Sequence, residues 1–280
     1  MKNCLLYIRP KHWIKNLLIF FPLIFGRKLF IFPDNFRVVI VFFLFTIASS
    51  AIYLVNDVLD REYDKVHPLK RLRPVASGKI SVSSALFVSF ALGTVSLIPA
   101  FLMNINIGWI LTWYILFNFL YTLCLKSVFV VDIICLTVFF IFRLMAGGVA
   151  AEAPIKPWVF YMTILLCLFL GLVKRRQELK FLKTDVKVAR SVLAKYDSCL
   201  IDWAIGALVF FILVAYIYCA MDARFLIFAL PFVIFSVWRY LYLVQFPGNC
   251  GDPIKIASTD RIIQVNIFFW MLTCVTLLYR

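Results

Sequence analysis

Long apolar stretches separated by short polar segments run along the whole chain. A helix needs about 20 apolar residues to cross the hydrocarbon of a bilayer. Nine stretches come close to this length, and the first is the weakest because Arg27 and Lys28 interrupt it. The stretches are residues 14–33, 37–56, 82–102, 107–124, 128–148, 157–173, 201–220, 224–244 and 262–279. The pattern predicts an all-α polytopic membrane protein in which residues 1–280 form a single domain of nine transmembrane helices.

The composition excludes several other classes of protein. Hydrophobic residues make up 64% of the chain and charged residues 15%, whereas soluble domains have about 45–50% and about 25%. A soluble enzyme, a disordered chain and a disulfide-built scaffold are therefore excluded. The 8 cysteines form no Cys-x-x-Cys pair, and we expect reduced thiols that pack as small apolar groups. The 2 histidines, His12 and His67, lie far apart in sequence and give little support for a histidine metal site or a catalytic triad.

The distribution of positive charge predicts the orientation in the membrane. The chain has 29 Lys and Arg against 14 Asp and Glu, and most of the basic residues fall in the alternate segments that begin with the N-terminus. Basic loops stay in the cytoplasm. We therefore expect a multi-pass protein of the cell membrane with a cytoplasmic N-terminus and an outer C-terminus. No cleavable signal peptide is evident, and the basic charge requires no nucleic-acid partner.

Acidic residues gather at the cytoplasmic end of the second stretch, in residues 56–64. On a continuing helix Asp57, Asp60 and Asp64 share one face, where like charges repel and the C-terminal helix dipole disfavours anions. A cation would relieve both costs, and Mg²⁺ prefers carboxylate oxygens shared with substrate phosphates. The segment therefore predicts a Mg²⁺ site with Asp57 and Asp60 as ligands. A solvated acidic turn remains the alternative.

A basic segment, residues 65–79, follows directly and contains Lys70 and Arg73. Pro68 and Pro74, which lie within this segment, end the helix that carries the acidic residues. Basic groups close behind a carboxylate cluster form a metal-plus-cation clamp suited to a diphosphate. The alternative is an ordinary basic loop.

The second long cytoplasmic segment begins at Lys174. Arg175 and Glu178 are three residues apart, Lys174 and Glu178 are four apart, and apolar residues continue at helical spacing. We expect an amphipathic helix at the membrane interface, with a basic face that binds either a phosphate of the substrate or anionic lipid head groups.

Three further polar residues lie close to the expected cytoplasmic side. Lys15 and Asn16 enter the first stretch, and Asp132 lies just inside the fifth. An intramembrane carboxylate is a functional candidate. Arg143, nearer the outer end of the same stretch, is expected to extend toward the outer surface and is left out of the site.

These motifs resemble the UbiA superfamily of intramembrane prenyltransferases, which hold Mg²⁺-diphosphate with two aspartate-rich motifs. The first motif matches at Asn56, Asp57, Asp60 and Asp64. The second departs, because Lys174-Arg175-x-x-Glu178 replaces Asp-x-x-x-Asp. That departure resembles the decaprenyl-phosphate phosphoribosyltransferase branch. The likeness extends to the segments Arg9-Pro10-x-x-Trp13-x-Lys15-Asn16, His67-Pro68-x-Lys70-Arg71-x-Arg73-Pro74, Arg143-x-x-x-Gly147 and Asp260-Arg261.

The resemblance implies Mg²⁺-dependent transfer of the 5-phosphoribosyl group from phosphoribosyl diphosphate to a polyprenyl phosphate, with release of diphosphate, as in cell-wall biosynthesis. It implies catalytic roles for Asp57, Asp60 and Glu178. The residues expected to contact substrates are Lys15, Asn16, Asn56, Asp64, Lys70, Arg73, Asp132, Lys174 and Arg175.

Two rival functions stay open. A UbiA-type prenyltransferase would move a prenyl chain from its diphosphate to an aromatic or other acceptor, but the missing second aspartate cluster argues against it. A transporter would place polar residues near the membrane midplane, whereas the acidic residues here cluster at one end of a stretch.

Overall fold

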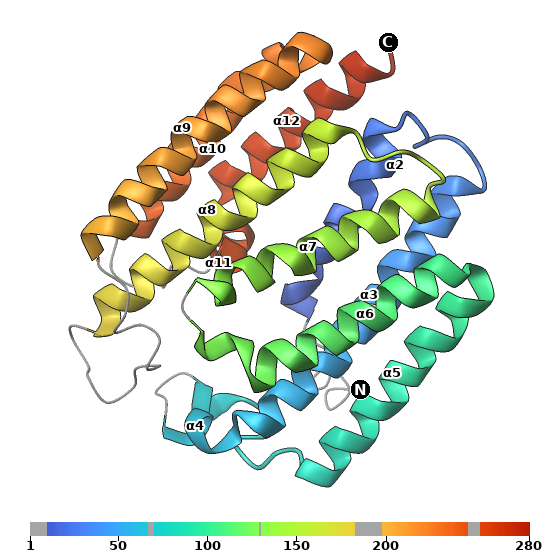
Figure 1. Ribbon diagram of the computed structural model, residues 1–280, viewed down its shortest axis with the longest axis vertical. Helices are drawn as coiled ribbons and strands as arrows, with labels where there is room; N and C mark the ends of the chain where they lie inside the picture. Colours follow the sequence, from blue (N-terminus) through green and yellow to red (C-terminus); the bar gives the residue numbers. More distant parts are fainter. Residues whose placement is uncertain (1–9, 67–69, 129, 183–197, 246–252) are drawn as a thin grey trace. The chain divides into compact units, whose positions relative to one another are not determined.

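The computed structural model describes residues 10–66, 70–128, 130–182, 198–245 and 253–280, and Figure 1 shows these ranges as helices joined by turns. No strand occurs within them, so the prediction of an all-α protein is confirmed. In chain order the elements are the 3₁₀ helix η1 (Pro10–Phe20), α2 (Phe21–Phe25), α3 (Asp34–Leu59), α4 (Arg61–Val66), η2 (Lys70–Leu72), α5 (Val82–Met103), α6 (Ile105–Leu123), η3 (Leu125–Ser127), α7 (Val131–Ala150), α8 (Pro157–Leu182), α9 (Ser198–Asp222), α10 (Phe225–Gln245), α11 (Pro253–Thr259) and α12 (Arg261–Leu278).

Among the described residues, 8 helices are long and apolar enough to cross a membrane, and they correspond to the last eight predicted stretches. The first predicted stretch is wrong in length. Its apolar helical part, Trp13–Phe25, is shorter than a full crossing, and the chain turns at Arg27, which has a φ of 59°. The charged pair Arg27 and Lys28 thus ends this helix instead of lying within it.

The helices group into two compact units. Unit 1 consists of Met1–Leu23, Phe30–Lys126 and Phe142–Ala153, and unit 2 of Ile24–Leu29, Ser127–Ile141 and Pro154–Arg280. The boundary passes through α7, whose first half belongs to unit 2 and whose second half belongs to unit 1. The single domain expected from the sequence stays a prediction.

In unit 1, α5 packs against both α3 and α6 (Figure 1). Asn104 makes the tight connection between α5 and α6, because its backbone N–H bonds the Ala100 carbonyl and its side chain accepts from Asn106 N at 2.8 Å. Such a residue satisfies backbone groups that both helix ends would leave unpaired. Ser89 Oγ on α5 donates to the carbonyl of Ala51 on α3 at 2.9 Å, deep in the unit.

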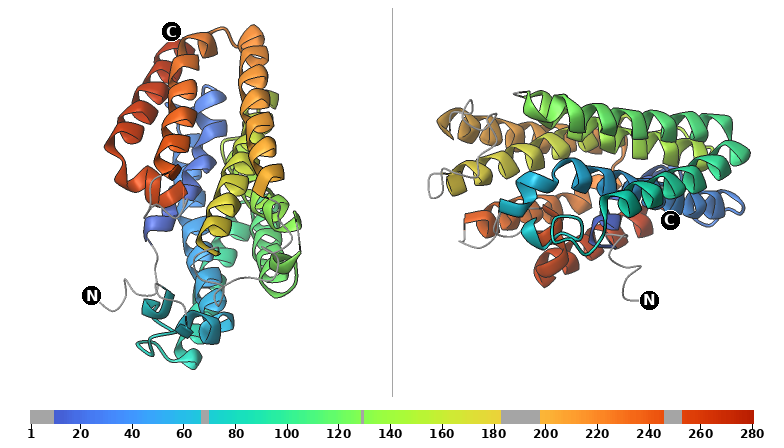
Figure 2. Two further views of the ribbon diagram at one scale, coloured as in Figure 1. Left: turned by 90° about the vertical axis from the view of Figure 1, so that its left-hand side faces the viewer. Right: turned by 90° about the horizontal axis from the view of Figure 1, so that it is seen from below.

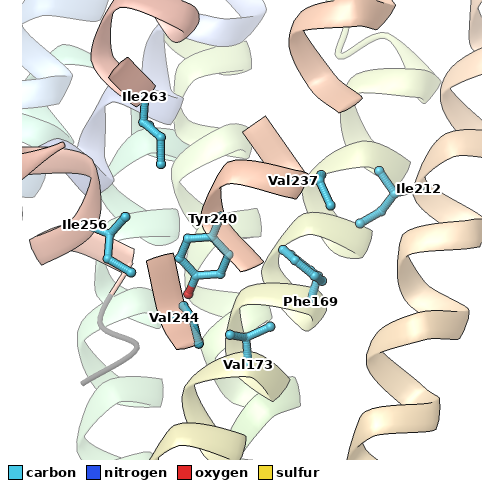
Figure 3. Packing of buried hydrophobic residues seen from close by; sticks show 8 residues of the cluster. All are labelled: Phe169, Val173, Ile212, Val237, Tyr240, Val244, Ile256 and Ile263. Atoms are coloured by element: carbon cyan, nitrogen blue, oxygen red, sulfur yellow. The ribbon is translucent and has the colours of Figure 1, made fainter. Parts of the chain in front are cut away.

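In unit 2, α10 packs against α9 and α12, and α8 packs against α9 (Figure 2). Figure 3 shows the buried cluster that these helices share. Its centre is the pair Phe169 and Tyr240, whose ring centroids lie 5.8 Å apart in an edge arrangement, a favoured geometry for aromatic rings. The remaining buried members are Val173, Ile212, Val237, Val244, Ile256 and Ile263.

Within unit 1, η1 lies directly against α7 at Gly147. A Cβ on Gly147 would overlap the carbonyl group of Ile19 and come within 3.0 Å of its Cα. Ile19 is fully buried. Only a residue without a side chain therefore permits this backbone approach.

We expect Gly147→Ala to lower the free energy of unfolding by about 1–3 kcal/mol, because the added methyl group overpacks the contact with backbone atoms. Thermal unfolding of the purified protein in detergent would measure this. Gly206→Ala is the matched control, because a Cβ there meets nothing within 4 Å and alanine favours the helix. Equal unfolding midpoints for the two variants would contradict the prediction.

Candidate functional site

The acidic segment lies where α3 ends. The helix is interrupted at Asp60, so Asp57 and Asp64 belong to the separate helices α3 and α4. The hydrogen bonds nevertheless keep helical spacing, from Asp60 N to the Asn56 carbonyl at 2.9 Å and from Asp64 N to the Asp60 carbonyl at 2.8 Å. Asp57 and Asp64 are buried. The three carboxylates predicted to share one helix face are thus held near one another across a small break.

Two basic side chains of unit 1 pair with this cluster. Arg73 Nη1 lies 2.6 Å from Asp64 Oδ2 and 3.3 Å from Asp57 Oδ1. Lys126 Nζ, in the short turn after α6, lies 2.7 Å from Asp60 Oδ1. The repulsion that led us to expect a metal ion is therefore relieved by the chain's own cations.

Apolar packing brings the basic segment back onto α3. Val75 and Ile80 are buried with Ala85, and Val58 of α3 packs against them. Gly78, with a φ of 74°, provides the turn that this return requires. Arg73, two residues before Val75, is thereby held beside Asp57 and Asp64.

Three further side chains of residues 56–79 have defined contacts. The side-chain oxygen of Asn56 accepts a hydrogen bond from Thr122 Oγ1 at 2.6 Å, so its amide orientation is fixed. Lys70 Nζ lies 5.3 Å from the centre of the Tyr63 ring. Glu62, on the same segment, is exposed, and the hydrogen bond from Lys65 holds the pKa of its carboxyl below the usual value.

The donor atoms suit a hard divalent cation that arrives with a substrate. Carboxylate and amide oxygens are the ligands that Mg²⁺ prefers, commonly one or two carboxylates together with substrate phosphates. The described residues contain no cluster of three or more His, Cys, Asp or Glu side chains arranged to hold a metal. Asp64 Oδ1 is buried and accepts no hydrogen bond from a described residue, which leaves acceptor capacity in the cluster. Asp57 and Asp60 as metal ligands stay a prediction.

A second polar network lies inside unit 1, and it corrects our expectation for Arg143. This residue is 3% exposed and does not extend to the outer surface. Its Nε donates to Asn16 Oδ1 at 2.7 Å and its Nη2 to the Tyr114 hydroxyl at 2.7 Å. Asn16 donates in turn to Thr46 Oγ1 at 3.0 Å. Asn16 is therefore held inside the helix bundle, while the neighbouring Lys15 stays partly exposed.

Unit 2 carries the second predicted motif at the end of α8. The predicted helix is confirmed as helical up to Leu182, and it continues α8 from Pro157 without a break. Its location at the membrane interface stays a prediction. Residues 183–197, the rest of the predicted helix, lie outside the described ranges. Arg175 is 2% exposed and pairs with Asp132 of α7, Nε to Oδ2 at 2.6 Å, and with Glu178.

Eight of the predicted site residues thus lie in two groups, Asn56, Asp57, Asp60, Asp64 and Arg73 in unit 1 and Asp132, Arg175 and Glu178 in unit 2. Asn16 belongs instead to the Arg143 network, and the substrate contacts predicted for Lys15, Lys70 and Lys174 stay predictions. Sequence reasoning missed Lys126, a single basic residue in a short loop. It also misjudged Arg143, although a charge within an apolar stretch is a functional signal.

Long apolar helices that end in paired acidic and basic side chains define a polytopic membrane protein with polar sites at its helix ends. Residues 19–252 match the UbiA prenyltransferase family, and the chain belongs to this family. The chain is 31% identical to decaprenyl-phosphate phosphoribosyltransferase of Mycobacterium tuberculosis, over 95% of this chain and 91% of that protein. It is 31% identical to the enzyme of the same name from Corynebacterium glutamicum, over 97% of this chain and 85% of that protein.

The fold has solved counterparts. The structure of a UbiA homologue from Archaeoglobus fulgidus bound to DMAPP and Mg²⁺ superposes with a TM-score of 0.74. The match covers 98% of both chains at 16% identity, so it shows the shared fold. Family and relatives together make this protein a transferase.

We expect Arg143→Met to lower the thermal unfolding midpoint by about 5 °C or more. The change leaves Asn16 Oδ1 without the donor Arg143 Nε, and an unsatisfied buried group costs about 1–3 kcal/mol. The Tyr114 hydroxyl loses one hydrogen bond but keeps its hydrogen bond with Ser49 Oγ at 3.0 Å. Arg71→Met, at an exposed position of η2, should leave the midpoint unchanged. A stable Arg143→Met protein would show that the network contributes little to the fold.

Proposed function

We propose that this protein transfers the 5-phosphoribosyl group of phosphoribosyl diphosphate to a polyprenyl phosphate. The bond between the anomeric carbon and the diphosphate oxygen breaks, and the diphosphate leaves with the electron pair. A new bond forms between the anomeric carbon and an oxygen of the lipid phosphate. The observation that carries this proposal is the 31% sequence identity with decaprenyl-phosphate phosphoribosyltransferases over nearly the full length of the chain.

The residue chemistry supports a polyanionic donor. Arg73 and Lys126 already lie among the carboxylates of unit 1 at 2.6 to 3.3 Å. We assign Arg73, Lys70 and Lys15 to the phosphates of the donor, and Lys174 to a phosphate of the donor or of the acceptor. Asp57 and Asp60 would hold Mg²⁺, with Asn56 fixed by Thr122. When bound, the ion would supply charge stabilisation on the leaving diphosphate.

The acceptor needs no strong base. The second pKa of a phosphate monoester is about 6, so a polyprenyl phosphate is already an anion at neutral pH. The work left to the side chains is to hold the two substrates in line and to stabilise negative charge as it grows on the leaving group. This agrees with a chain that has only 2 histidines.

The location of the reaction follows from the solubility of its substrates. Phosphoribosyl diphosphate is soluble in water, whereas the polyprenyl tail is soluble only in the bilayer. We therefore place the protein in the cell membrane, with its N-terminus and its donor site on the cytoplasmic side, where the excess of Lys and Arg is expected.

Prenyl transfer is the second candidate, because the family is named for it and a protein of the same fold was solved with DMAPP. Such an enzyme would use its acidic motifs to hold the diphosphate of a prenyl donor. In this chain the second motif is Lys174-Arg175-x-x-Glu178, and Arg175 pairs with two carboxylates. We therefore favour the sugar donor.

A donor screen tests the proposal directly. Purified protein in detergent is incubated with Mg²⁺, a polyprenyl phosphate and either phosphoribosyl diphosphate or a prenyl diphosphate with an aromatic acceptor, and the lipid products are identified by mass spectrometry. We expect phosphoribosyl addition to the polyprenyl phosphate, and no product when EDTA removes the metal. Product from the prenyl donor alone would reverse the assignment.

We expect Asp57→Asn to reduce turnover at least a hundredfold, because a metal ion supplies several kcal/mol of charge stabilisation and each 1.4 kcal/mol is about tenfold in rate. Arg73 would still pair with Asp64, so the unfolding midpoint should stay near that of the wild type. Glu62→Gln is the control on the same segment, because Glu62 is exposed. Near-normal turnover of Asp57→Asn would remove the metal from the mechanism.

A further inference from the structure

Two adjacent arginines of α8 have different surroundings. Arg176 pairs in a bidentate manner with Asp202 of α9, at 2.6 and 2.7 Å, and Asp202 is 53% exposed. Arg175 is 2% exposed and joins the fully buried Asp132 to Glu178. Arg176 thus forms a surface ion pair, whereas Arg175 is enclosed between two carboxylates.

The packing of α7 against α8 fixes Arg175 in this position. Gly171 lies one helical turn before Arg175 and hence on the same face. A Cβ on Gly171 would come within 2.8 Å of Ile133 Cγ2. Ile133 follows Asp132 directly, so the close approach that Gly171 permits holds Arg175 beside Asp132.

Of the three paired side chains Asp132, Arg175 and Glu178, only that of Glu178 is accessible to a water-soluble molecule. The side chain of Asp132 is 0% exposed and that of Arg175 is 2% exposed, whereas that of Glu178 is 30% exposed. A buried guanidinium that already binds two carboxylates is poorly placed to bind a phosphate. It is well placed to fix the direction of the exposed carboxylate.

A carboxylate selects its ligand by charge and by hydrogen-bonding type. Ionised Glu178 is an acceptor only, with about four lone-pair sites on two oxygens, and it repels phosphate. Adjacent hydroxyls of a sugar are neutral donors at a spacing that one carboxylate can accept. In phosphoribosyl diphosphate these are the ribose hydroxyls, and a prenyl diphosphate has none.

We propose that Glu178 binds the ribose hydroxyls of the donor, and that Asp132 and Arg175 are positioning residues that orient its carboxylate. This rests on the proposed function and narrows it, because it makes Glu178 the residue that distinguishes a sugar donor from a prenyl donor. It also reassigns Arg175 and Asp132, which the sequence had assigned to substrate contact.

Inhibition by two sugar phosphates tests the proposal. Ribose 5-phosphate and 2-deoxyribose 5-phosphate differ in one hydroxyl, and each is added as a competitor of phosphoribosyl diphosphate in the transfer assay. For the wild type we expect ribose 5-phosphate to bind about tenfold or more tightly than the deoxy sugar, as for a charge-assisted hydrogen bond. In Glu178→Gln the preference should fall to about twofold or less.

The preference for ribose 5-phosphate over the deoxy sugar also tests the positioning residues, in variants that keep Glu178. Arg175→Lys and Asp132→Asn should each reduce the preference, because the carboxylate is no longer held in place. If either single variant fails to fold, Asp132→Asn combined with Arg175→Gln removes both buried charges together and should give the same loss. Asp202→Asn is the matched control, because it releases only Arg176, and it should keep the wild-type ratio.

The outcomes separate this inference from the proposed function. Transfer by the wild type with equal inhibition by the two sugars would overturn the hydroxyl contact and leave the function standing. Loss of the preference in Glu178→Gln, with the full preference kept in Arg175→Lys and in the Asp132→Asn and Arg175→Gln double variant, would overturn the positioning role. A wild type that uses only a prenyl donor would overturn both.

Discussion

The pairing of carboxylates with the chain's own cations is the constraint on which both polar sites depend. Charges within an apolar helix bundle are costly unless they are paired. In unit 1, Arg73 forms ion pairs with two buried aspartates, and Lys126 forms an ion pair with a third aspartate. In unit 2, Arg175 forms ion pairs with Asp132 and Glu178. In each site every one of these carboxylates therefore has a cationic partner before any substrate is bound, although the carboxylates outnumber the cations by one.

This pairing has a chemical consequence for a diphosphate donor. A cation that neutralises a carboxylate competes with a metal ion for the same oxygens. If a diphosphate brought Mg²⁺ to Asp57 and Asp60, Lys126 would lose its contact with Asp60, and Arg73 would lose its longer contact with Asp57 but keep Asp64. Both cations would then lie where they could pair with the anionic phosphates. Under the proposed function, the same basic groups would stabilise first the cluster without substrate and then the bound donor.

The sequence alone predicted the elements that depend on local pattern. Asp57, Asp60 and Asp64 were grouped by helical spacing, and the structure keeps that spacing across the break at Asp60. The sequence pattern could not predict which residues pair with partners that are distant in the chain. Arg143 binds Asn16 from 127 residues away and Lys126 binds Asp60 from 66. The helix from Lys174 onward was predicted, but the burial of Arg175 was not, because its partner Asp132 lies on another helix.

The central claim is that the paired carboxylates accept a metal ion only together with the donor. The most direct test is to measure the binding of Mn²⁺, a paramagnetic substitute for Mg²⁺, to the purified protein by electron paramagnetic resonance. Free Mn²⁺ is quantified with and without phosphoribosyl diphosphate, against the donor alone in buffer. We expect Mn²⁺ to bind weakly to the protein alone and at least about tenfold more tightly when the donor is present. Asp60→Asn should abolish this increase in affinity. Equally tight Mn²⁺ binding without the donor would contradict it.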